Sequence, residues 1–297
     1  MEVGFIGIGQ MGGRMSRRIL EAGHALTVYD LRKDAAKPLL DKGAKWAGTP
    51  KAATETCRVI ISCLPTPINV QEIVYGSNGL LAGWKKGDIY VDMSTNSPTV
   101  IRQVAKDAKA AGVGVLDAPV TGGTRGAQDG TLAIMVGGDK RYLEEVRQIL
   151  QAMGKKIVHV GDVGCGNIAK LVNNLISLTS NTICAEAFVL GVKAGIDPQT
   201  LWEITVSGTA NNWNLQQYPE TVFKGNFEPG FKLSLGAKDL GLALQLGREY
   251  GVPLFVGAAA EQSFTEAKAA GFEDKSVDSV VLYLERLTGV EVRSSKK

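Results

Sequence analysis

Short apolar runs alternate with helical patterns along the first half of the chain. The apolar runs are five or six residues long, which is the usual length of a strand. Strands are predicted over Val3–Ile8, Ala25–Asp30, Val59–Cys63, Ile89–Met93, Gly114–Ala118, Thr131–Val136 and Lys156–Val160. Apolar residues three and four positions apart predict helices over Met11–Ala22, Ala35–Lys42, Thr99–Ala111 and Arg141–Met153. Strands that alternate with helices are typical of a mostly parallel sheet covered on both faces.

The second half of the chain has a different pattern. Strand-like runs disappear after Gly166, and a long apolar helix is predicted over Asn167–Ala194. Further helices are predicted near Pro198–Val206, Lys238–Tyr250, Ala258–Ala270 and Ser276–Leu287. The sequence therefore predicts an α/β domain over residues 1–163 and an all-α domain over residues 164–297, joined by the long helix.

The first predicted strand runs directly into the glycine motif Gly7-x-Gly9-x-x-Gly12, and a helical pattern follows. In such a motif the first glycine permits a tight turn, the second lets the backbone approach a pyrophosphate, and the third lets the helix pack closely on the strand. The helix N-terminus also directs free N–H groups at the phosphates. This context predicts a Rossmann-type dinucleotide-binding domain. The predicted cofactor-binding residues of the loop are Gly7, Ile8, Gly9, Gln10, Met11 and Gly12.

Asp30 ends the second predicted strand, 18 positions after Gly12. This is close to the spacing of about twenty expected for the acidic residue that binds the adenosine ribose of NAD. A carboxylate there repels a 2′-phosphate, which favours NAD over NADP. Arg32 is the kind of residue that accepts that phosphate, unless it is a solvated loop charge beside Lys33 and Asp34. We therefore expect NAD, with NADP as the alternative, and both Asp30 and Arg32 among the cofactor-binding residues.

Composition restricts the function classes. The 297 residues, 44% hydrophobic and 21% charged, are typical of a globular protein with two domains. A net charge of +3 without a long basic run does not indicate a nucleic-acid partner. Polar residues inside the long helix argue against a membrane span, and the early sequence lacks the basic start of a signal peptide. The four cysteines form no CxxC pair, so we expect a cytoplasmic location. Two histidines cannot form a multi-histidine metal site, and no metal is expected.

Two further strand ends are candidates for ligand contact, because open α/β sheets bind ligands at the carboxyl ends of their strands. The segment Cys63–Pro67 follows one strand and Ser94–Asn96 follows the next. Alternatively, Pro65 and Pro67 only shape a loop, and the segment Ser94–Ser97 only caps a helix. Position alone leaves both interpretations open.

A glycine-rich stretch, Asp117–Thr131, follows the strand that ends near Ala118. Backbone N–H groups around Gly122 and Gly123 would suit a small anion such as a carboxylate. A flexible turn gives the same sequence pattern and is favoured when the stretch is considered alone.

The long helix carries the sharper chemical signal. Asn167 is placed to cap it, which puts Lys170 in the first turn and Asn174 four residues further on the same face. Burial and the positive end of the helix dipole both lower the pKa of an ammonium group, which suits acid–base chemistry near neutral pH. A lysine paired with a carboxylate between domains is the structural alternative. His24, in a turn, and His159, in a strand-like run, are poorly placed to act as a base.

Together these motifs resemble the β-hydroxyacid dehydrogenase family, the group that contains 3-hydroxyisobutyrate dehydrogenase and tartronate semialdehyde reductase. The likeness runs nearly end to end. It rests on the segments Gly4–Gly12, Asp117–Gly123, Gly130–Leu132, Gly164–Asn174 and Lys238–Leu244. The resemblance implies an N-terminal Rossmann domain, a helical C-terminal domain and a cleft between them.

The resemblance also implies roles for single residues. Lys170 matches the family's catalytic lysine, and Asn174 matches an asparagine that orients the substrate. Thr121, Gly122 and Gly123 match the loop that binds the substrate carboxylate, where the family usually has serine in place of Thr121. The hydroxyl group is retained, so the same role is expected.

Lys238 has two readings. Its sequence context alone suggests a surface ion pair with Asp239 at the start of a helix. The resemblance instead implies that Lys238 contacts both substrate and cofactor, closing the site over the nicotinamide. The other implied cofactor contacts are Leu64, Pro65, Asn69 and Thr95.

The implied activity is that of an NAD-dependent oxidoreductase that interconverts a small 3-hydroxy or 4-hydroxy acid and its semialdehyde or keto acid, with Lys170 as general acid and base. Alternatives are a sulfonate- or dicarboxylate-specific member of the family, of the sulfolactaldehyde or hydroxymethylglutarate type, and a non-catalytic NAD(P)-binding protein. An imine reductase is a further rival. The last two classes usually lose the lysine that this chain keeps. The expected partner is a small hydroxy-acid or semialdehyde substrate, and a homodimer or homotetramer is expected.

The sequence does not select one substrate. The segment Ser207–Asn214 is polar and aromatic, so it either lines the acid-binding end of the site or is a plain interhelical loop. Arg125 is a candidate to pair with a second acidic group, a carboxylate or a sulfonate.

Overall fold

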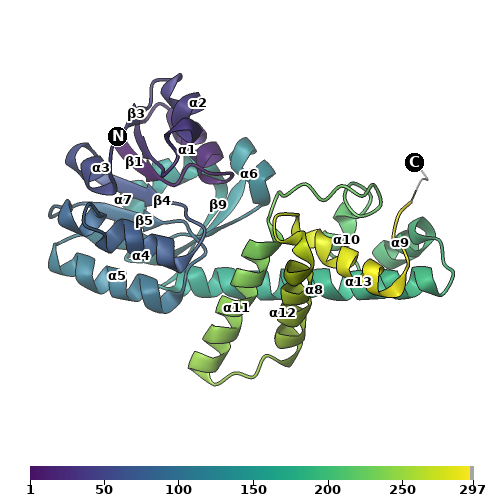
Figure 1. Ribbon diagram of the computed structural model, residues 1–297. Coiled ribbons are helices and arrows are strands. Elements are labelled where there is room, and N and C mark those ends of the chain that lie inside the picture. The colour runs from purple at the N-terminus through teal and green to yellow at the C-terminus, as the bar shows by residue number, and fades with distance from the viewer. Residues whose placement is uncertain (295–297) are drawn as a thin grey trace. The chain divides into compact units, whose positions relative to one another are not determined.

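The computed structural model describes residues 1–294. The chain divides into two compact units, Met1–Lys170 and Leu171–Lys297 (Figure 1). The division falls inside one long helix, whereas the sequence pattern puts the domain boundary at residue 163. The first residues of that helix therefore belong to the unit that contains the sheet.

The first unit is built on one nine-stranded sheet. Its strands are β1 (Glu2–Ile6), β2 (Ala25–Tyr29), β3 (Lys45–Trp46), β4 (Val59–Ser62), β5 (Ile89–Asp92), β6 (Gly114–Asp117), β7 (Val120–Thr121), β8 (Leu132–Gly138) and β9 (Gly154–Gly161). The order begins β3-β2-β1-β4-β5-β6, and these strands are parallel. β8 is antiparallel to β6 and β7, and β9 pairs parallel with β8. The mostly parallel sheet is thus confirmed, and its order reverses between β1 and β4, where such sheets bind ligands.

Helices cover both faces of this sheet, as the sequence predicts. One hydrophobic core lies under α1 (Gly12–Glu21), α6 (Gly123–Asp129) and α7 (Lys140–Met153). A second lies under α3 (Pro50–Thr56), α4 (Pro67–Tyr75) and α5 (Pro98–Ala110), which lie in front of the sheet in Figure 1. Strand β4 contributes to both cores: Val59 and Ile61 point to the first and Ile60 to the second. Because both faces are buried, such a strand is apolar throughout.

The apolar pattern misses α3 and α4, although both have a clear local start. In each, a threonine side chain accepts a hydrogen bond from the backbone three residues on, Thr49 from Ala52 and Thr66 from Asn69. A proline occupies the next position after each threonine. Pro67, which the loop interpretation assigns to an irregular segment, therefore starts a helix.

Two other helix starts differ from expectation. α5 begins at Pro98, but the Ser97 side chain does not cap it. The backbone N–H of Ser97 instead donates to Asn96 Oδ1 at 2.7 Å. The helix expected over Ala35–Lys42 is a 3₁₀ turn, Lys33–Ala36, followed by the short α2 (Lys37–Leu40). Proline in the first turn of α2 lacks the N–H that would continue one regular helix through both.

Helix α8 (Cys165–Lys193) begins two residues before Asn167, so Asn167 is not its cap and Lys170 lies in the second turn. By length and composition α8 is the one helix of residues 1–294 that could cross a membrane, with a mean hydropathy of 1.5. Of its apolar window 39% is buried, and Asn174 and Asn181 are buried as well. The core helix of a globular domain gives the same pattern.

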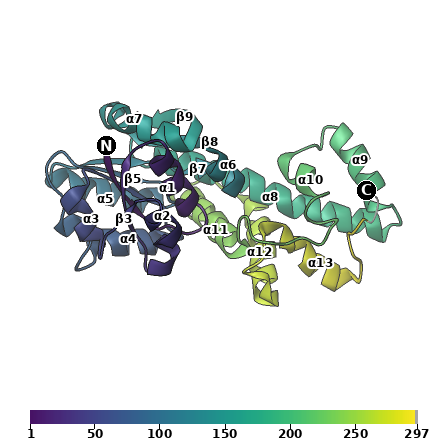
Figure 2. The ribbon, with the colours of Figure 1, turned by 90° about the horizontal axis from the view of Figure 1, so that it is seen from above.

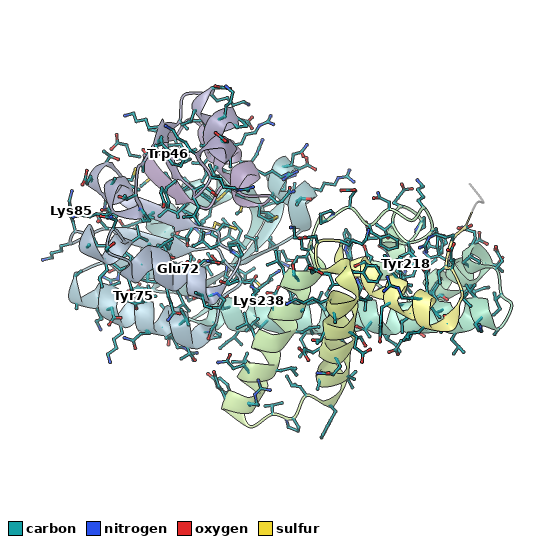
Figure 3. All side chains as sticks on the ribbon, viewed as in Figure 1. Trp46, Glu72, Tyr75, Lys85, Tyr218 and Lys238 are labelled. Carbon is teal, nitrogen blue, oxygen red and sulfur yellow. The ribbon has the colours of Figure 1, made fainter. Side chains whose placement is uncertain are left out.

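The second unit is helical, as predicted. After α8 it contains α9 (Pro198–Ser207), α10 (Trp213–Gln217), α11 (Leu233–Tyr250), α12 (Phe255–Ala267) and α13 (Val280–Thr288), with short turns over Lys268–Phe272 and Val277–Ser279. Figure 2 shows the same helices from a second direction. The aromatic core is formed by Phe188, Tyr218 and Phe223, whose ring centroids lie 5.0 to 6.2 Å apart (Tyr218 in Figure 3).

Helix α11 begins five residues before Lys238, so Lys238 does not open it. The backbone N–H groups of Leu233 and Ser234 donate to the carbonyl oxygens of Lys275 and Glu273. This capping comes from a distant segment, and the local sequence does not reveal it.

Candidate functional site

The three glycines of the first loop have different surroundings. Gly7 has a φ of +87°, and a Cβ there would lie 2.5 Å from the carbonyl oxygen of Cys63. A Cβ on Gly12 would overlap the carbonyl oxygen of Gly7, so α1 packs directly on the turn. A Cβ on Gly9 would have no heavy atom within 4 Å. Folding therefore requires glycine at Gly7 and Gly12, whereas the open space beside Gly9 fits a pyrophosphate close to the backbone.

Asp30 lies beside this loop. Its Oδ2 accepts a hydrogen bond of 2.9 Å from the backbone N–H of Ile8, and its Oδ1 accepts one of 2.9 Å from Arg32. The carboxylate thus fixes the backbone of the glycine loop against the end of β2. The side chains of Arg32 and Lys33 are exposed. Arg32 therefore meets Asp30 through its backbone and extends into solvent.

The ends of β4 and β5 lie side by side, as the sequence predicts. The backbone N–H of Leu64 donates to Ser94 Oγ at 2.9 Å, which joins the two loops. Asn69 lies in the first turn of α4, where its Nδ2 donates to Glu72 Oε2 at 3.1 Å (Glu72 in Figure 3). Thr95 is half-buried beside Ser94. The loop after β1 meets this edge too, because Gly7 packs against Leu64.

The glycine-rich stretch is not a flexible turn. Thr121 ends β7, and Gly122 and Gly123 have φ values of +123° and +63°, which favour glycine. Helix α6 then occupies Gly123–Asp129. Arg125 on this helix is exposed and lies 3.7 Å from Asp129 in a surface ion pair.

The first turn of α8 is held by Asp117, the last residue of β6. Asp117 Oδ1 accepts from the backbone N–H of Gly164 at 2.8 Å, and Oδ2 accepts from the backbone N–H of Asn167 at 2.7 Å. The side-chain amide of Asn167 also donates to Oδ2 at 3.2 Å. Burial raises the pKa of the Asp117 carboxyl group, and these three N–H donors act in the opposite direction. Lys170 follows Asn167 by one helical turn.

A second buried carboxyl group, Asp92, lies beside Asp117 in the register of β5 and β6. Asp92 Oδ1 accepts from Ser62 Oγ at 2.9 Å and from the backbone N–H of Ser94 at 3.1 Å. Asp92 Oδ2 accepts from Asn96 Nδ2 at 2.9 Å. Burial raises the pKa of Asp92 as well.

In the second unit, Asn174, Lys238 and Asp239 form one cluster (Lys238 in Figure 3). Asn174 Nδ2 donates to Asp239 Oδ2 at 2.6 Å, and Lys238 Nζ lies 2.8 Å from Asp239 Oδ1. The second contact is an ion pair without hydrogen-bond alignment, since Asp239 Oδ1 has no hydrogen-bond partner. Asp239 is buried and Lys238 is mostly buried, so the pair is not on the surface. The reading of Lys238 as a surface charge is wrong.

The remaining candidates make contacts of other kinds. His159 Nε2 lies 2.7 Å from the carbonyl oxygen of Gly138 in the sheet, and His24 Nδ1 lies 3.4 Å from the N-terminal amine. The segment Ser207–Asn214 includes the start of α10, and Asn212 caps that helix by accepting from the backbone N–H of Leu215. Among residues 1–294, no group of three His, Cys, Asp or Glu side chains is placed to hold a metal ion.

Sequence reasoning missed Asp117 as the cap of α8 and Asp239 as the partner of Asn174. Asp117 directly ends an apolar strand, and a buried acid at that place needs donors. The lack of a side chain at Gly164, just before α8, also indicates that the cap comes from elsewhere. For Asp239 the signal is weaker, because Asn174 lies 65 residues away in the sequence.

Two known protein families match the chain, one over each half. Residues 2–161 match the NAD binding domain of 6-phosphogluconate dehydrogenase. Residues 164–284 match the family described as the NAD-binding domain of NADP-dependent 3-hydroxyisobutyrate dehydrogenase. The first match supports the Rossmann-type domain and the binding of NAD(P), and the second covers the helical part.

Relatives of known activity match over nearly the whole length. The 2-(hydroxymethyl)glutarate dehydrogenase of Eubacterium barkeri is 37% identical, and the match covers 98% of this chain and 97% of that protein. The 3-hydroxyisobutyrate dehydrogenase of Pseudomonas aeruginosa is 37% identical over 93% of this chain and 95% of its own. The solved structure of Mycobacterium tuberculosis 3-hydroxyisobutyrate dehydrogenase with L-serine has a TM-score of 0.87 and 33% identity, covering 95% and 98% of the two chains.

Proposed function

The chain belongs to the β-hydroxyacid dehydrogenase family, and from this membership we propose that it interconverts a small 3-hydroxy or 4-hydroxy acid and its semialdehyde or keto acid. One observation carries the proposal: a single compact unit contains the glycine loop, the Thr121–Gly123 loop and Lys170. These are the cofactor-binding, anion-binding and acid–base groups that such a reaction needs.

The residues of the first unit fit a dinucleotide. The open space beside Gly9 and the N-terminus of α1 suit its pyrophosphate. Asp30, Leu64 and Thr95 are proposed to hold its ribose and nicotinamide parts. When bound, the cofactor supplies the acceptor or donor of the hydride. NAD is the preferred form because of Asp30, with Arg32 as the feature that would admit NADP.

Lys170 is the proposed general acid and base. In the oxidation direction its neutral amine takes the proton of the substrate hydroxyl group while the hydride leaves the carbon that bears this hydroxyl group. In the reduction direction its ammonium group gives that proton to the carbonyl oxygen. The proton and the hydride together balance the two-electron change between alcohol and carbonyl compound.

The acid group of the substrate is proposed to bind the Thr121 hydroxyl group and the backbone around Gly122 and Gly123. Holding the acid group fixes which carbon faces the cofactor, and such orientation is a large part of catalysis. Asn174 and Lys238 are proposed to bind the rest of the substrate, with Lys238 also contacting the nicotinamide.

Replacing Lys170 with alanine tests the assignment. We expect Lys170→Ala to lose at least about 10³-fold in kcat, because the proton has no acceptor, while NADH binding measured by fluorescence stays within twofold. Lys156→Ala, which replaces an exposed lysine of strand β9, is the matched control and should keep full turnover. Near-normal turnover of Lys170→Ala would contradict the proposed mechanism.

A substrate panel tests the class. The panel contains 3-hydroxy and 4-hydroxy monocarboxylates, hydroxymethyl-dicarboxylates and sulfonated analogues, assayed with NAD and with NADP. Turnover of the dicarboxylates or sulfonates alone would favour the specialised members of the family. No turnover of any hydroxy acid would overturn the proposed function.

We also propose a homodimer or homotetramer in which copies meet along α8. Val172, Ile176, Ile183 and Leu190 lie four or seven residues apart on one face and are 49% to 70% exposed. The same stripe on a second copy is self-complementary under two-fold symmetry. Ile183→Glu with Leu190→Glu should lower the mass measured by light scattering. A monomeric wild-type protein would contradict the proposal.

A cytoplasmic location is the last part of the proposal. The cysteines Cys57, Cys63, Cys165 and Cys184 are free thiols, which fits a reducing compartment. Fractionation of cells that carry the natural protein tests it, and recovery of the protein outside the cytoplasm would contradict it.

A further inference from the structure

The first unit contains a buried polar network that the proposed reaction does not use. Asp92, Asn96, Asp117 and Asn167 are each 0% exposed. They lie at the ends of β5 and β6 and at the start of α8. Buried polar groups of this kind are costly unless each is paired, so the network has a specific structural task.

The first part of the network is a cap supplied from another element. The initial N–H groups of a helix have no partner within the helix, and a side chain just before it usually accepts from them. Gly164 stands just before α8 and has no side chain. Asp117 replaces that missing cap by accepting from the backbone N–H groups of Gly164 and Asn167. The start of α8 is therefore tied to the end of β6 as well as to its own preceding loop, where the backbone N–H of Cys165 donates to the carbonyl oxygen of Asp162.

The second part is a bridge made by Asn167. Its Nδ2 donates to Asp117 Oδ2 at 3.2 Å, and its Oδ1 accepts from the backbone N–H of Asn96 at 2.7 Å. Asn96 in turn donates to Asp92. One side chain thus joins α8 to two loops: the loop of Thr95, proposed to bind the cofactor, and the segment from Asp117 to the anion loop.

The first turn of α8 also packs closely against the sheet, which leaves it no room to shift. A Cβ on Gly166 would lie 2.6 Å from the carbonyl oxygen of Met135 and 2.9 Å from Asp117 Oδ2. A Cβ on Gly137 would lie 2.7 Å from the carbonyl oxygen of Asp162 and 2.8 Å from the nitrogen of Gly166. The first turn of α8 therefore lies directly on the backbone of β6 and β8.

We propose that Asp117 is the positioning residue of Lys170. Lys170 follows Asn167 by three residues, so the two side chains lie on one face of α8 and the ammonium group is carried by the turn that follows the one Asp117 holds. The same carboxylate starts the segment that leads to Thr121, Gly122 and Gly123. Asp117 thereby sets the position of the acid–base group relative to the anion loop. This inference rests on the proposed function of Lys170.

The test compares three variants in kcat, KM and NADH affinity. Asp117→Asn keeps the shape of the side chain but replaces one carboxylate oxygen with an NH₂ group. One of the two backbone N–H groups then faces a donor and loses its acceptor. Asn167→Ala removes the bridge and leaves the bonds of Asp117 to the backbone. Asp88→Asn is the matched control: Asp88 is also buried and also accepts from a backbone N–H, that of Lys85, but at the start of β5.

We expect Asp117→Asn to lower kcat about 10- to 100-fold, because a displacement near 1 Å costs up to about 10²-fold in rate. NADH affinity should stay within twofold, because the glycine loop is untouched. Asn167→Ala should lower kcat several-fold, and it serves as the test if Asp117→Asn does not fold. Asp88→Asn should keep kcat within twofold.

Two results would overturn the inference. One is an unchanged kcat in Asp117→Asn, or in Asn167→Ala if only that variant folds. The other is an equal loss of kcat in Asp88→Asn at the same loss of thermal stability. A structural role alone would also lower the residual turnover of Lys170→Ala when Asp117→Asn is added. A positioning role leaves that residual turnover unchanged, because the positioned group is already absent.

Failure of the proposed function gives a different result. If Lys170→Ala keeps its turnover, the acid–base assignment is wrong whatever Asp117 does. If Lys170→Ala is inactive and Asp117→Asn is fully active, only the positioning role is wrong.

Discussion

The backbone N–H of Ile8 donates a 2.9 Å hydrogen bond to Asp30 Oδ2. The acidic residue at the end of β2 therefore fixes the backbone of the glycine loop by a bond within the protein itself. The other oxygen accepts from the backbone N–H of Arg32. Asp30 therefore has a structural task in addition to the proposed contact with the cofactor ribose. Each task predicts a different consequence of its replacement.

Asp30→Ala should weaken NADH binding about tenfold or more and raise the preference for NADP relative to NAD by a similar factor. The loop loses its anchor, and the charge that repels a 2′-phosphate is removed. The ratio of kcat/KM for the two cofactors measures the second effect. Asp34→Ala, an exposed acid in the following turn, is the control. An unchanged ratio in Asp30→Ala would show that Asp30 does not select the cofactor.

Alanine at Gly12 and at Gly9 should give opposite results. At Gly12 the added Cβ overlaps the carbonyl oxygen of Gly7, so we expect a loss of stability of at least about 1–3 kcal/mol. At Gly9 the Cβ meets nothing, so the thermal midpoint should stay within about 2 °C. NADH binding should nevertheless weaken, because the Cβ fills the space proposed for the pyrophosphate. Thermal unfolding and NADH fluorescence measure the two effects, and a Gly9→Ala variant with normal NADH binding contradicts the proposed site.

Local patterns predict this chain well where local interactions decide its structure. The strand–turn–helix of the glycine motif and the position of Asp30 follow from sequence spacing, and the sheet and the helical unit appear as expected. The starts of α8 and α11 do not, because their caps come from Asp117 and from the backbone near Lys275. Pairings over such long separations leave no periodic signal.

The same reason explains which parts of the candidate site are visible in the sequence. Lys170 and Asn174 are four residues apart on one helix, so their spacing alone puts them on one face. Asp239 is 65 residues from Asn174, and only the folded chain brings its carboxylate to 2.6 Å from the Asn174 amide.

Asp92 should make stability depend on pH in a direction unusual for an acidic group. Burial raises its pKa, so the folded protein holds the proton more tightly than the unfolded chain. Its contribution to stability is then fully present below the unfolded pKa of about 3.9 and is lost as the pH rises through the folded pKa. Each unit of pKa shift corresponds to about 1.4 kcal/mol.

The measurement for Asp92 is urea unfolding of the wild type and of Asp92→Asn between about pH 4 and about pH 8. The amide does not titrate, so the free energy of unfolding of the wild type minus that of the variant should fall as the pH rises. The lost hydrogen bond of the variant offsets this difference by a constant, and the loss of the Asp92 charge, a charge that raises the pKa of Asp117, makes the difference fall in the same direction. A difference that stays constant or rises with pH contradicts the assignment.

The effects of replacing Lys238 and Asp239 should be coupled when stability is measured, whereas turnover should depend on Lys238 alone. Lys238→Met leaves a carboxylate with 3% of its side chain exposed without its partner charge, so we expect a loss of up to about 3 kcal/mol. Adding Asp239→Asn removes that charge while its amide oxygen still accepts from Asn174. The double variant should therefore recover most of the stability, whereas turnover should stay low because Lys238 is absent.

Lys224→Met, in the exposed pair with Glu220, is the control and should change stability by less than about 1 kcal/mol. If the double variant is no more stable than Lys238→Met, the two charges are not coupled, and if it regains turnover, Lys238 has no role in the reaction.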